Sequence, residues 1–473
     1  MSDTLPIDKA RAQVDEAWRT DILPALEDFI RIPAKSPAFD PHWATHGYLD
    51  EAVSLAEDWC QRIAPPQSQV EVIRLPGRTP LLWVDVPATG EGEALLYGHL
   101  DKQPEASGWD SDKGPWQPVI AEDRLYGRGA ADDGYALFAS LQAIRLLHDE
   151  GVPHPRCMLV IECAEESGSP DLAAQLDHLA DRLGNPGLVV CLDSGCANYE
   201  QLWVTTSLRG MAAGDLSVEV LEQGVHSGDA GGVVPSSFRI ARALIERLEE
   251  SATGRITHPA LQADIPEERR RQATAAAEVI GGGLAGKFPF AGTTRPNATD
   301  TAELILNRTW RPALEVIGAE GLPASSEAGN VLRPRTALRL SLRLPPTVDG
   351  ETATRAMAET LTDDPPQGAR VQFHPGGSAN GWNAPGFAGW LEDSLNASAR
   401  RWFQREAVFM GEGGSIPLMN LLASRFPAAR FLVTGVLGPG ANAHGHNEFL
   451  HLPMARRLTG VVAEALAAQA TSA

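Results

Sequence analysis

The chain has 473 residues, and its hydrophobic (43%) and charged (21%) fractions are close to those of an average soluble globular protein. This length is well beyond the usual size of one domain, so we expect two domains. The formal net charge of -21 argues against nucleic-acid binding, because phosphate contacts need clustered Lys and Arg.

The chain shows no pattern of a targeting signal or a membrane span. Residues Met1–Asp8 are mostly polar and lack the basic start and apolar run of a signal peptide. No stretch approaches the roughly 18 apolar residues of a membrane span. An odd number of cysteines without a CxxC pair favours buried reduced thiols over disulfides or a thiolate zinc site: Cys60, Cys157, Cys163, Cys191 and Cys196. We therefore expect a cytoplasmic protein.

The first part of the chain has the pattern of an α/β domain. Apolar residues at helical spacing predict a helix over Arg11–Ile32, which Pro24 should kink or break. A second helix is predicted over Tyr135–Glu150, with Gly151 as its C-terminal stop. The short apolar runs around it predict buried strands: Ala94–Tyr97, Met158–Ile161 and Leu188–Leu192.

Ionisable residues come directly after these three strands. His99 and Asp101 follow the first strand, Glu165 and Glu166 the second, and Asp193 the third. In open α/β sheets, ligands bind outside the carboxyl ends of the strands. Three separate segments should therefore place ionisable groups at the same edge of one sheet.

The middle of the chain predicts a small α+β domain with a half-exposed sheet. An amphipathic helix is expected over Ser237–Glu250 and a shorter helix over Glu351–Leu361. Leu338–Leu344 alternates between leucine and polar residues, which is the period of a strand. A further strand at Arg370–Phe373 precedes a Gly/Pro-rich linker at Pro375–Gly386.

The α/β pattern then resumes, with three elements that close the chain: a helix at Trp390–Phe403, a strand at Phe431–Leu437 and a helix at Pro453–Ala468. We predict an α/β catalytic domain over 1–207 and 387–473, with a mainly parallel sheet flanked by helices. A second domain, an α+β domain of βαββαβ type, is inserted over 208–386.

Several residues suit a metal site, although each has a plainer explanation. His99 could bind a metal while Asp101 orients its ring; alternatively, the two form an ordinary pair on a loop. Asp132 follows a Gly-rich turn and could bridge two cations, but Asp is also common at a helix N-terminus.

Glu165 and Glu166 are costly to bury side by side without a counter-charge. With a metal ion nearby, one would bind it while the other takes a proton from water; the alternative is a solvated turn. Asp193 alone indicates little, and His444 lies in a Gly-rich loop that could equally be plain surface. A lone histidine such as His226 is more often structural.

Taken together and in this order, these segments resemble the M20 family of metallopeptidases over nearly the whole chain. That family includes carnosine-type dipeptidases, Glu-releasing carboxypeptidases and deacylases of acylated amino acids. Three motifs match the dipeptidase-like branch: Tyr97–Pro104, Glu165–Ser169 and Gly413–Pro417.

The resemblance implies two divalent metal ions per subunit. It assigns His99 and Asp193 to one ion, Glu166 and His444 to the other, Asp132 as the bridge, Glu165 as the general base, and Asp101 as the residue that orients His99. Zinc suits this mixed set of imidazoles and carboxylates, with manganese and cobalt as alternatives.

The resemblance also implies that the inserted domain is a lid through which the chain forms a homodimer. His226 would then reach the partner subunit's site and stabilise the oxyanion. Arg343 would bind the substrate carboxylate, Ser415 lies in the loop that would hold the substrate backbone, and Asn330 is a further candidate of that kind.

Two positions depart from the family's pattern. Relatives often carry Lys where this chain has Gly134, and some carry Arg where it has Gly411. Neither position is a proposed metal ligand. Both leave the identity of the substrate open, because a lost cation near the pocket alters which charged group it prefers.

We therefore predict a metal-dependent hydrolase that cleaves the amide bond of dipeptides or short peptides with a free C-terminal carboxylate. The alternatives are a deacylase of N-acyl amino acids on the same fold and a non-catalytic relative that binds peptides. Glu165 beside all five ligands argues against the latter, because a binding module has no need of a base. We expect no nucleic-acid or membrane partner.

Overall fold

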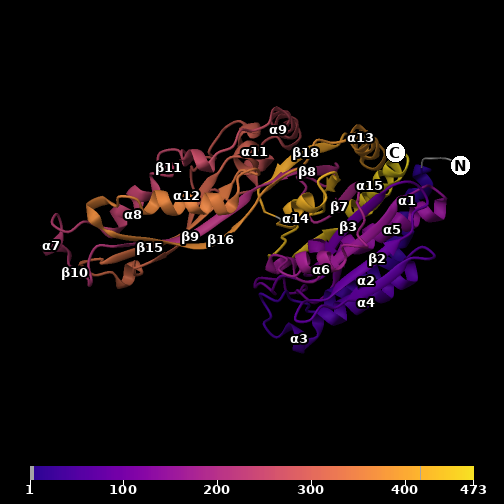
Figure 1. Ribbon diagram of the computed structural model, residues 1–473, viewed down its shortest axis with the longest axis horizontal. Coiled ribbons are helices and arrows are strands. Elements are labelled where there is room, and N and C mark those ends of the chain that lie inside the picture. The colour runs from indigo at the N-terminus through magenta and orange to yellow at the C-terminus, as the bar shows by residue number, and fades with distance from the viewer. Residues whose placement is uncertain (1–4, 416, 473) are drawn as a thin grey trace. The chain divides into compact units, whose positions relative to one another are not determined.

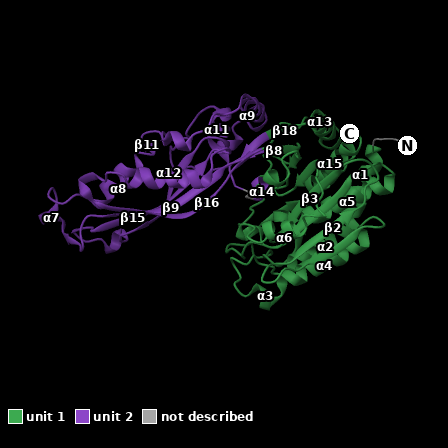
Figure 2. Cartoon of the chain, in the orientation of Figure 1, with its two compact units in different colours: residues 1–205, 384–409, 421–473 green, residues 206–383, 410–420 purple. Residues whose placement is uncertain are grey.

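The computed structural model describes residues 5–415 and 417–472, which form two compact units (Figure 1 and Figure 2). Unit 1 comprises Met1–Thr205, Ala384–Phe409 and Leu421–Ala473, and unit 2 comprises Thr206–Asn383 and Met410–Asn420. The sequence assigns 208–386 to the insertion, and the structure adds Met410–Asn420 to the same unit. Ile416 of the Gly413–Pro417 motif and the first four residues of the polar N-terminal segment lie outside the described residues.

Unit 1 is built on a six-stranded sheet in the order β1-β2-β6-β3-β7-β19. β6, β3, β7 and β19 run parallel, whereas β1 and β2 pair antiparallel at one edge. The strands are β1 Gln69–Ile73, β2 Leu81–Val86, β3 Glu93–His99, β6 Arg156–Glu162, β7 Leu188–Cys191 and β19 Arg430–Val433. The predicted α/β class, with a mainly parallel sheet, is confirmed.

The helices of unit 1 flank this sheet; α4 packs against β1 and β2, and α5 against β3 and β6 (Figure 1). They are α1 Ile7–Ala17, the π-helical turn η1 Trp18–Ile22, α2 Leu23–Arg31, α3 Trp43–His46, α4 Tyr48–Ile63, α5 Tyr135–Glu150, α6 Leu172–His178, α13 Gly389–Phe403 and α15 Leu452–Ala470. A small antiparallel sheet adds β4 Val119–Ala121, β5 Arg124–Tyr126 and β20 Phe449–His451.

Two helices show how the local sequence sets their ends. α5 begins directly after Gly134 and ends at Gly151, whose φ of 65° is the left-handed C-cap conformation that glycine adopts freely. The predicted helix over Arg11–Ile32 is interrupted by η1. Pro24 lies in the first turn of α2, where its missing N–H costs nothing. The break therefore lies just before the proline.

The burial of the parallel strands explains why polar residues gather at one edge. All of β7 and all but the first residue of β3 are buried, so the first polar positions come at their carboxyl ends. His99 is the last residue of β3, Asp193 closely follows β7, and Glu165 and Glu166 closely follow β6. The predicted placement of these groups at one sheet edge is confirmed.

Unit 2 contains an antiparallel sheet in the order β13-β15-β9-β16. Its main elements are, in chain order, β9 Gly210–Glu219, α8 Ser237–Ile245, β13 Ala313–Glu320, β15 Arg335–Leu344, α12 Gly350–Thr362 and β16 Arg370–Ala379. This is the predicted βαββαβ order. α8 and α12 pack against the sheet through a core that includes Leu340, Leu342 and Met357.

Two predicted elements of unit 2 have different ends. The helix over Ser237–Glu250 stops at Ile245, because Glu249–Glu250 forms the short strand β11, which pairs with β12 (Arg255–Ile256). β16 continues to Ala379, so the linker prediction is wrong over its first residues. Pro375 is tolerated there because β16 is an edge strand whose register shifts just after it.

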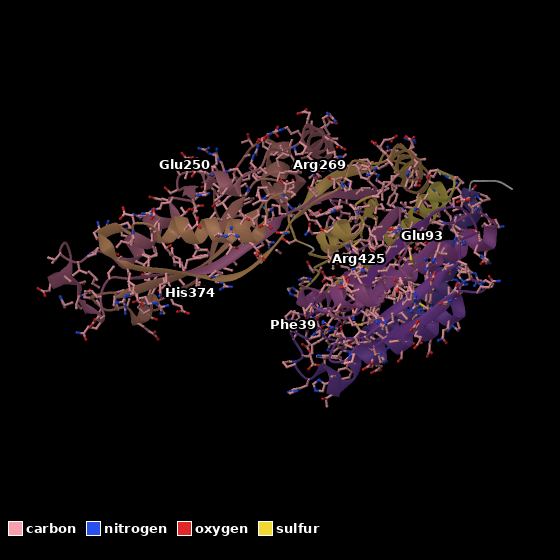
Figure 3. The ribbon with its side chains drawn as sticks, in the orientation of Figure 1. Phe39, Glu93, Glu250, Arg269, His374 and Arg425 are labelled. Carbon is pink, nitrogen blue, oxygen red and sulfur yellow. The ribbon has the colours of Figure 1, made fainter. Side chains whose placement is uncertain are left out.

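Smaller elements complete the structure, and β8, β18 and α14 each span a unit boundary. They are β8 Trp203–Leu208, β10 Val225–His226, α7 Ser227–Ala230, η4 Pro259–Leu261, α9 Glu267–Ile280, α10 Gly283–Gly286, α11 Thr301–Thr309, η5 Ser325–Glu327, β14 Val331–Leu332, η6 Pro366–Gly368, β17 Trp382–Asn383, β18 Val408–Glu412 and α14 Pro417–Arg425. Arg269 anchors α9, because it is 5% exposed and donates to Asn383 Oδ1 at 3.0 Å (Figure 3). None of the described helices is long and apolar enough to cross a membrane.

The substitution Gly460→Ala should destabilise the protein, although Gly→Ala in an exposed helix interior usually stabilises by about 1 kcal/mol. Gly460 lies in α15, and a Cβ there would meet ring atoms of Trp402 on α13 at 2.1–2.5 Å. Overpacking of this kind costs about 1–3 kcal/mol, so the clash outweighs the gain in helix propensity. Urea denaturation should show a lower midpoint for the variant than for the parent.

The matched control is Gly389→Ala in α13, because an added Cβ at Gly389 meets nothing within 4 Å. This variant should keep the parental midpoint or exceed it slightly. Equal midpoints for the two variants would contradict the role of the Gly460–Trp402 contact.

Candidate metal centre

The five predicted metal ligands lie together in unit 1. The ligand atoms of His99, Asp132 and Asp193 fall within 4.8 Å of one another, and so do those of Asp132, Glu166 and His444. Asp132 belongs to both groups, as expected of a carboxylate that bridges two ions. The structure thus gathers every residue that the sequence assigns to the ions, while their binding role stays a prediction.

Each of these side chains is held at the carboxyl edge of the sheet by a strand end, a turn or a loop. Asp132 lies in η2 (Ala130–Gly134), the turn before α5, and Glu166 lies in η3 (Glu165–Ser167) after β6. His444 lies in the loop after β19 with a φ of 65°, which few residues other than glycine adopt. Backbone conformations of this kind cluster at functional sites.

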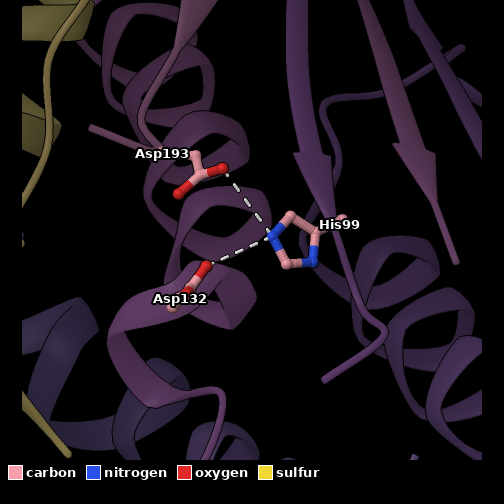
Figure 4. A group of neighbouring side chains, drawn as sticks. All are labelled: His99, Asp132 and Asp193. Atoms are coloured by element: carbon pink, nitrogen blue, oxygen red, sulfur yellow. Dashed lines mark ion pairs between the residues drawn. The ribbon is translucent and has the colours of Figure 1, made fainter. Parts of the chain in front are cut away.

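The environment of His99 calls for a cation. Its Nδ1 lies 3.0 Å from the carbonyl oxygen of Asp101, so in the neutral ring this nitrogen carries the hydrogen and donates it. Nε2 then carries a lone pair and can only accept. It nevertheless faces two carboxylate oxygens, Asp132 Oδ1 at 3.4 Å and Asp193 Oδ2 at 3.8 Å, without a hydrogen bond (Figure 4). Buried acceptors that face one another need positive charge between them.

The carboxyl groups of the cluster are crowded as well. Burial and the nearby Asp132 raise the pKa of Glu166 to about 10 and hold the pKa of Asp193 well above its usual value. Burial also acts on Asp132, but the neighbouring imidazoles of His444 and His99 lower its pKa. Bound divalent cations would replace the protons that such a cluster otherwise retains.

Buried carboxylate oxygens without hydrogen-bond partners also indicate that the site binds cations. In the described part of the chain, Glu166 Oε1 and both carboxylate oxygens of Asp133 are buried without a hydrogen-bond partner. Gln103 Nε2 donates to Glu166 Oε2 at 2.5 Å, and His444 Nε2 lies 3.3 Å from the same oxygen. The donor set of carboxylate oxygens and imidazole nitrogens therefore fits divalent ions such as zinc or manganese.

The observed contact between Asp101 and His99 differs from the predicted one. The predicted acceptor for the ring N–H is the Asp101 carboxylate, but that carboxylate lies 3.5 Å from Nδ1, and the backbone carbonyl of Asp101 takes the bond. The carboxylate instead accepts the backbone N–H groups of Glu165 at 3.1 Å and Glu166 at 3.0 Å. Asp101 thus orients His99 through its main chain and holds the Glu165–Glu166 turn through its side chain.

Glu165 is a half-buried carboxyl group beside the cluster. Burial raises its pKa to about 7; the field of His99 opposes this shift, and Asp101 and Asp132 add to it. A carboxyl group with a pKa near neutrality can both accept and release a proton at neutral pH. Glu165 therefore stays the predicted general base of the site.

A buried ion pair that the sequence reasoning missed supports the His444 loop. Arg128 and Glu448 have 1% and 0% side-chain exposure, and their Nη1 and Oε2 atoms lie 2.6 Å apart. Arg128 Nη2 also donates to the carbonyl of Gly445, next to His444, at 2.7 Å. Because the two residues are 320 positions apart, nothing local in the sequence pairs them.

The same pair also supports the turn that carries Asp132. Glu448 Oε1 accepts the backbone N–H groups of Gly129 at 3.0 Å and Ala131 at 3.3 Å. The Arg128–Glu448 pair thus ties the loop of one predicted ligand to the turn of another. The only available signal was that Arg128 lies in the Gly-rich turn before Asp132 and that Glu448 lies in the loop that carries His444.

The two departures from the family's pattern are both crowded positions. A Cβ on Gly134 would lie 2.3 Å from the Phe29 ring, and a Cβ on Gly411 would lie 2.3 Å from Ser207 Oγ and 3.0 Å from Thr309. The packing therefore leaves no room at either position for the Lys or Arg of relatives.

The predicted substrate residues all lie in unit 2, where they form two separate pairs. Arg343 Nη1 is 3.4 Å from Ser415 Oγ. The exposed His226 adjoins Asn330, whose carbonyl accepts the N–H of Ser227 at 2.9 Å. Their contacts with a substrate stay predictions.

These two pairs lie at opposite ends of unit 2. Arg343 pairs with Met211 at the start of β9, whereas β10, which carries His226, follows the other end of β9 at Glu219. A strand advances about 3.4 Å per residue, so Met211 and Glu219 are separated by roughly 27 Å. Figure 1 shows β10 at one of these ends and β18, which ends shortly before Ser415 in the chain, at the other.

Comparisons with known proteins identify relatives along most of the chain. The model of Peptidase family M20/M25/M40 matches residues 95–468. The chain is 29% identical over 384 residues to the cysteinylglycine-S-conjugate dipeptidase of Corynebacterium striatum, covering 78% of this chain and 79% of that protein. It is 26% identical over 374 residues to a Cys-Gly metallodipeptidase of Schizosaccharomyces pombe, covering 76% of each.

Solved structures show that the fold is shared. Human carnosine dipeptidase 1 superimposes with a TM-score of 0.73 at 20% identity, over 99% of both chains. A dipeptidase from Saccharomyces cerevisiae superimposes with a TM-score of 0.75 at 19% identity, also over 99% of both chains. The predicted fold class is thus confirmed by comparison as well as by topology.

The substitution Arg128→Lys should weaken zinc binding by about 10- to 100-fold, the usual effect of losing a residue that supports metal ligands. Lysine keeps the charge but cannot hold Glu448 and the Gly445 carbonyl with separate nitrogens. Competition with a chelating dye measures the zinc affinity of parent and variant.

The matched control is Arg156→Lys, which disturbs the ion pairs of Arg156 with Asp85 and Glu93 at the opposite end of β3 and β6. This variant should bind zinc like the parent. If Arg128→Lys also retains parental affinity, the pair does not organise the site.

Proposed function

We propose, since the chain belongs to peptidase family M20/M25/M40, that this metallopeptidase hydrolyses the amide bond of dipeptides with a free C-terminal carboxylate. The single observation that carries the proposal is that Asp132 belongs to two groups of potential metal ligands, with Glu165 next to them. The dipeptidase names of its relatives support the substrate class.

The site would hold two divalent ions, with zinc as the first choice and manganese or cobalt as alternatives. His99 and Asp193 would hold one ion, Glu166 and His444 the other, and Asp132 would bind both. Such ions polarise an amide carbonyl and lower the pKa of water, which supplies a nucleophile at neutral pH.

Glu165 would move the proton. Its carboxylate would accept a proton from the attacking water and deliver it to the nitrogen of the leaving amine. The bonds from Asp101 to the backbone of Glu165 and Glu166 keep base and ligand in one fixed turn. Precise placement of this kind matters because small displacements of a catalytic group cost large factors in rate.

Arg343 would recognise the substrate's C-terminal carboxylate. Its guanidinium is half-buried and has no carboxylate partner among the described residues, so it is available for a bidentate pair. Ser415, which is 3.4 Å from Arg343 Nη1, would contact the substrate backbone, and Asn330 is a further candidate for such a contact.

The active form would be a homodimer built through unit 2. Because the ends of β9 are roughly 27 Å apart, one chain cannot bring His226 to a substrate held by its own Arg343. His226 would therefore stabilise the oxyanion in the partner subunit's site. A cytoplasmic location is part of the proposal, and the buried cysteines are compatible with it.

A deacylase would use the same chemistry on a different substrate, so a substrate panel separates the two functions. Dipeptides with a free C-terminal carboxylate should be cleaved faster than N-acyl amino acids in the presence of zinc or manganese. Faster cleavage of the N-acyl compounds would make the chain a deacylase.

The substitution Glu165→Gln should lower kcat for dipeptide cleavage by about 100- to 10,000-fold, which is the usual contribution of general acid–base catalysis. The amide cannot take up the proton, while the residues assigned to the ions are unchanged. Metal analysis should therefore find the parental zinc content. The control Glu105→Gln removes a carboxylate paired with Lys35 and should retain parental kcat. Comparable turnover in Glu165→Gln and the parent would reject Glu165 as the base.

Mixed dimers test the proposed role of His226. His226→Ala and Glu165→Gln homodimers should both be nearly inactive, but a heterodimer of the two contains one site with both an intact Glu165 and an intact His226. Random mixing makes half of the dimers hybrid, each with one working site, so roughly one quarter of the parental activity should return. If no activity returns although hybrids form, His226 does not act across the dimer.

A further inference from the structure

Unit 2 contains a cavity for which the peptidase reaction has no assigned use. Its volume is about 1170 Å³, more than a small organic ligand needs. Its walls come from the β11–β12 hairpin, the start of α9, α10, the following loop and α11. All of these segments belong to unit 2.

The cavity is strongly cationic, although the chain as a whole carries a net charge of -21. Two carboxylates, Asp264 and Glu315, line it. Six arginines also line it: Arg209, Arg255, Arg270, Arg295, Arg308 and Arg311. A concave site of one charge sign concentrates small ions of the opposite sign.

Half of these arginines are neutralised by neighbours and half are not. Three have a carboxylate partner: Arg255 with Glu250, Arg308 with Glu412 and Arg311 with Glu303. Among the described residues, the other three, Arg209, Arg270 and Arg295, have no carboxylate within ion-pair distance. Of these three, Arg209 is buried and Arg270 and Arg295 are exposed, so an anion at the cavity would pair with one desolvated and two solvated guanidinium groups.

Arg209 shows most clearly that positive charge is in excess. It is 9% exposed, and within the described part of the chain its guanidinium donates only long hydrogen bonds, at 3.3–3.4 Å, to the carbonyls of Gly413, Asn307 and Arg311. Burial and repulsion from Arg343 and Arg308 lower its pKa to about 10. The carbonyls hold the group in place, but they carry no full negative charge to balance it.

The remaining walls are partly apolar. Leu284 is buried at the cavity, whereas Phe288 and Phe290 are 51% and 43% exposed. The two phenylalanine rings approach edge to face, with centroids 6.5 Å apart. Exposed aromatic rings beside unpaired arginines suit a ligand that combines anionic groups with an apolar body.

We propose that this cavity binds a small organic molecule that carries two carboxylate or phosphate groups on an apolar body. The second anionic group matters because three guanidinium groups without a carboxylate partner line the cavity and can bind more than one anionic group. The ligand could be a separate small molecule, or it could be a dipeptide substrate with an acidic side chain, which would rest on the proposed peptidase function. The shared chemistry is the dianion, and the experiment below separates the two sources.

Calorimetric titration of the zinc-loaded protein with benzene-1,3-dicarboxylate tests the cavity without turnover. Benzoate, with one carboxylate, should bind at least about tenfold more weakly than the dicarboxylate. The double variant Arg270→Gln/Arg295→Gln removes two exposed, unpaired arginines, so its thermal unfolding should match the parent. Its affinity for the dicarboxylate should fall by about tenfold or more.

The matched control is Arg242→Gln, an exposed arginine on α8 outside the cavity lining, which should bind like the parent. The proposal is overturned if the dicarboxylate does not bind at millimolar concentration. It is also overturned if the double variant and the control bind it equally.

Kinetics then identify the source of the anion. If it is a substrate side chain, the double variant should raise KM for Ala-Glu while leaving KM for Ala-Gln unchanged. If it is a separate molecule, the variant should lose dicarboxylate binding with neither KM altered; both outcomes support the cavity. A protein that binds the dicarboxylate but cleaves no dipeptide would refute the peptidase proposal alone.

Discussion

The structure depends on the mutual placement of acceptors around Asp132. His99 Nε2, Asp132 and Asp193 turn lone pairs toward one another in a buried pocket, and Glu166 adds a carboxylate oxygen without a partner. Each buried, unpaired carboxylate costs several kcal/mol, so this arrangement needs positive charge from outside the chain. Two divalent ions would supply that charge and would explain why, among the described residues, only Asp132 belongs to both halves of the cluster.

The rest of unit 1 serves to hold that cluster in place. Parallel strands bring three polar segments to one edge, the Asp101 carboxylate fixes the Glu165–Glu166 turn, and the Arg128–Glu448 pair joins the two remaining loops. Unit 2 contributes a different constraint. The length of β9 keeps His226 away from the substrate carboxylate that Arg343 would bind in the same chain, so the proposed role of His226 would require a second chain.

Much of this could be predicted from the sequence, because its strongest signals are local. Apolar runs and capping glycines place β3, β6, β7 and α5, and the polar residues just beyond the strands place His99, Glu166 and Asp193 at one sheet edge. The resemblance to M20 metallopeptidases adds Asp132 and His444 to the predicted ligands. Relations across the chain that the resemblance does not cover could not be predicted. The Arg128–Glu448 pair spans 320 positions, and the carboxylate of Asp101 bonds to backbone groups that the sequence cannot orient. The extension of β16 past Pro375 depends on that strand lying at a sheet edge, which no local pattern reveals.

The proposed two-ion site is tested most directly by anomalous diffraction at the zinc edge from crystals of the zinc-loaded protein. Two peaks are expected on either side of the Asp132 carboxylate, one beside His99 and Asp193 and the other beside Glu166 and His444. A single peak in contact with one half only, or peaks that leave Asp132 without a metal, would contradict it.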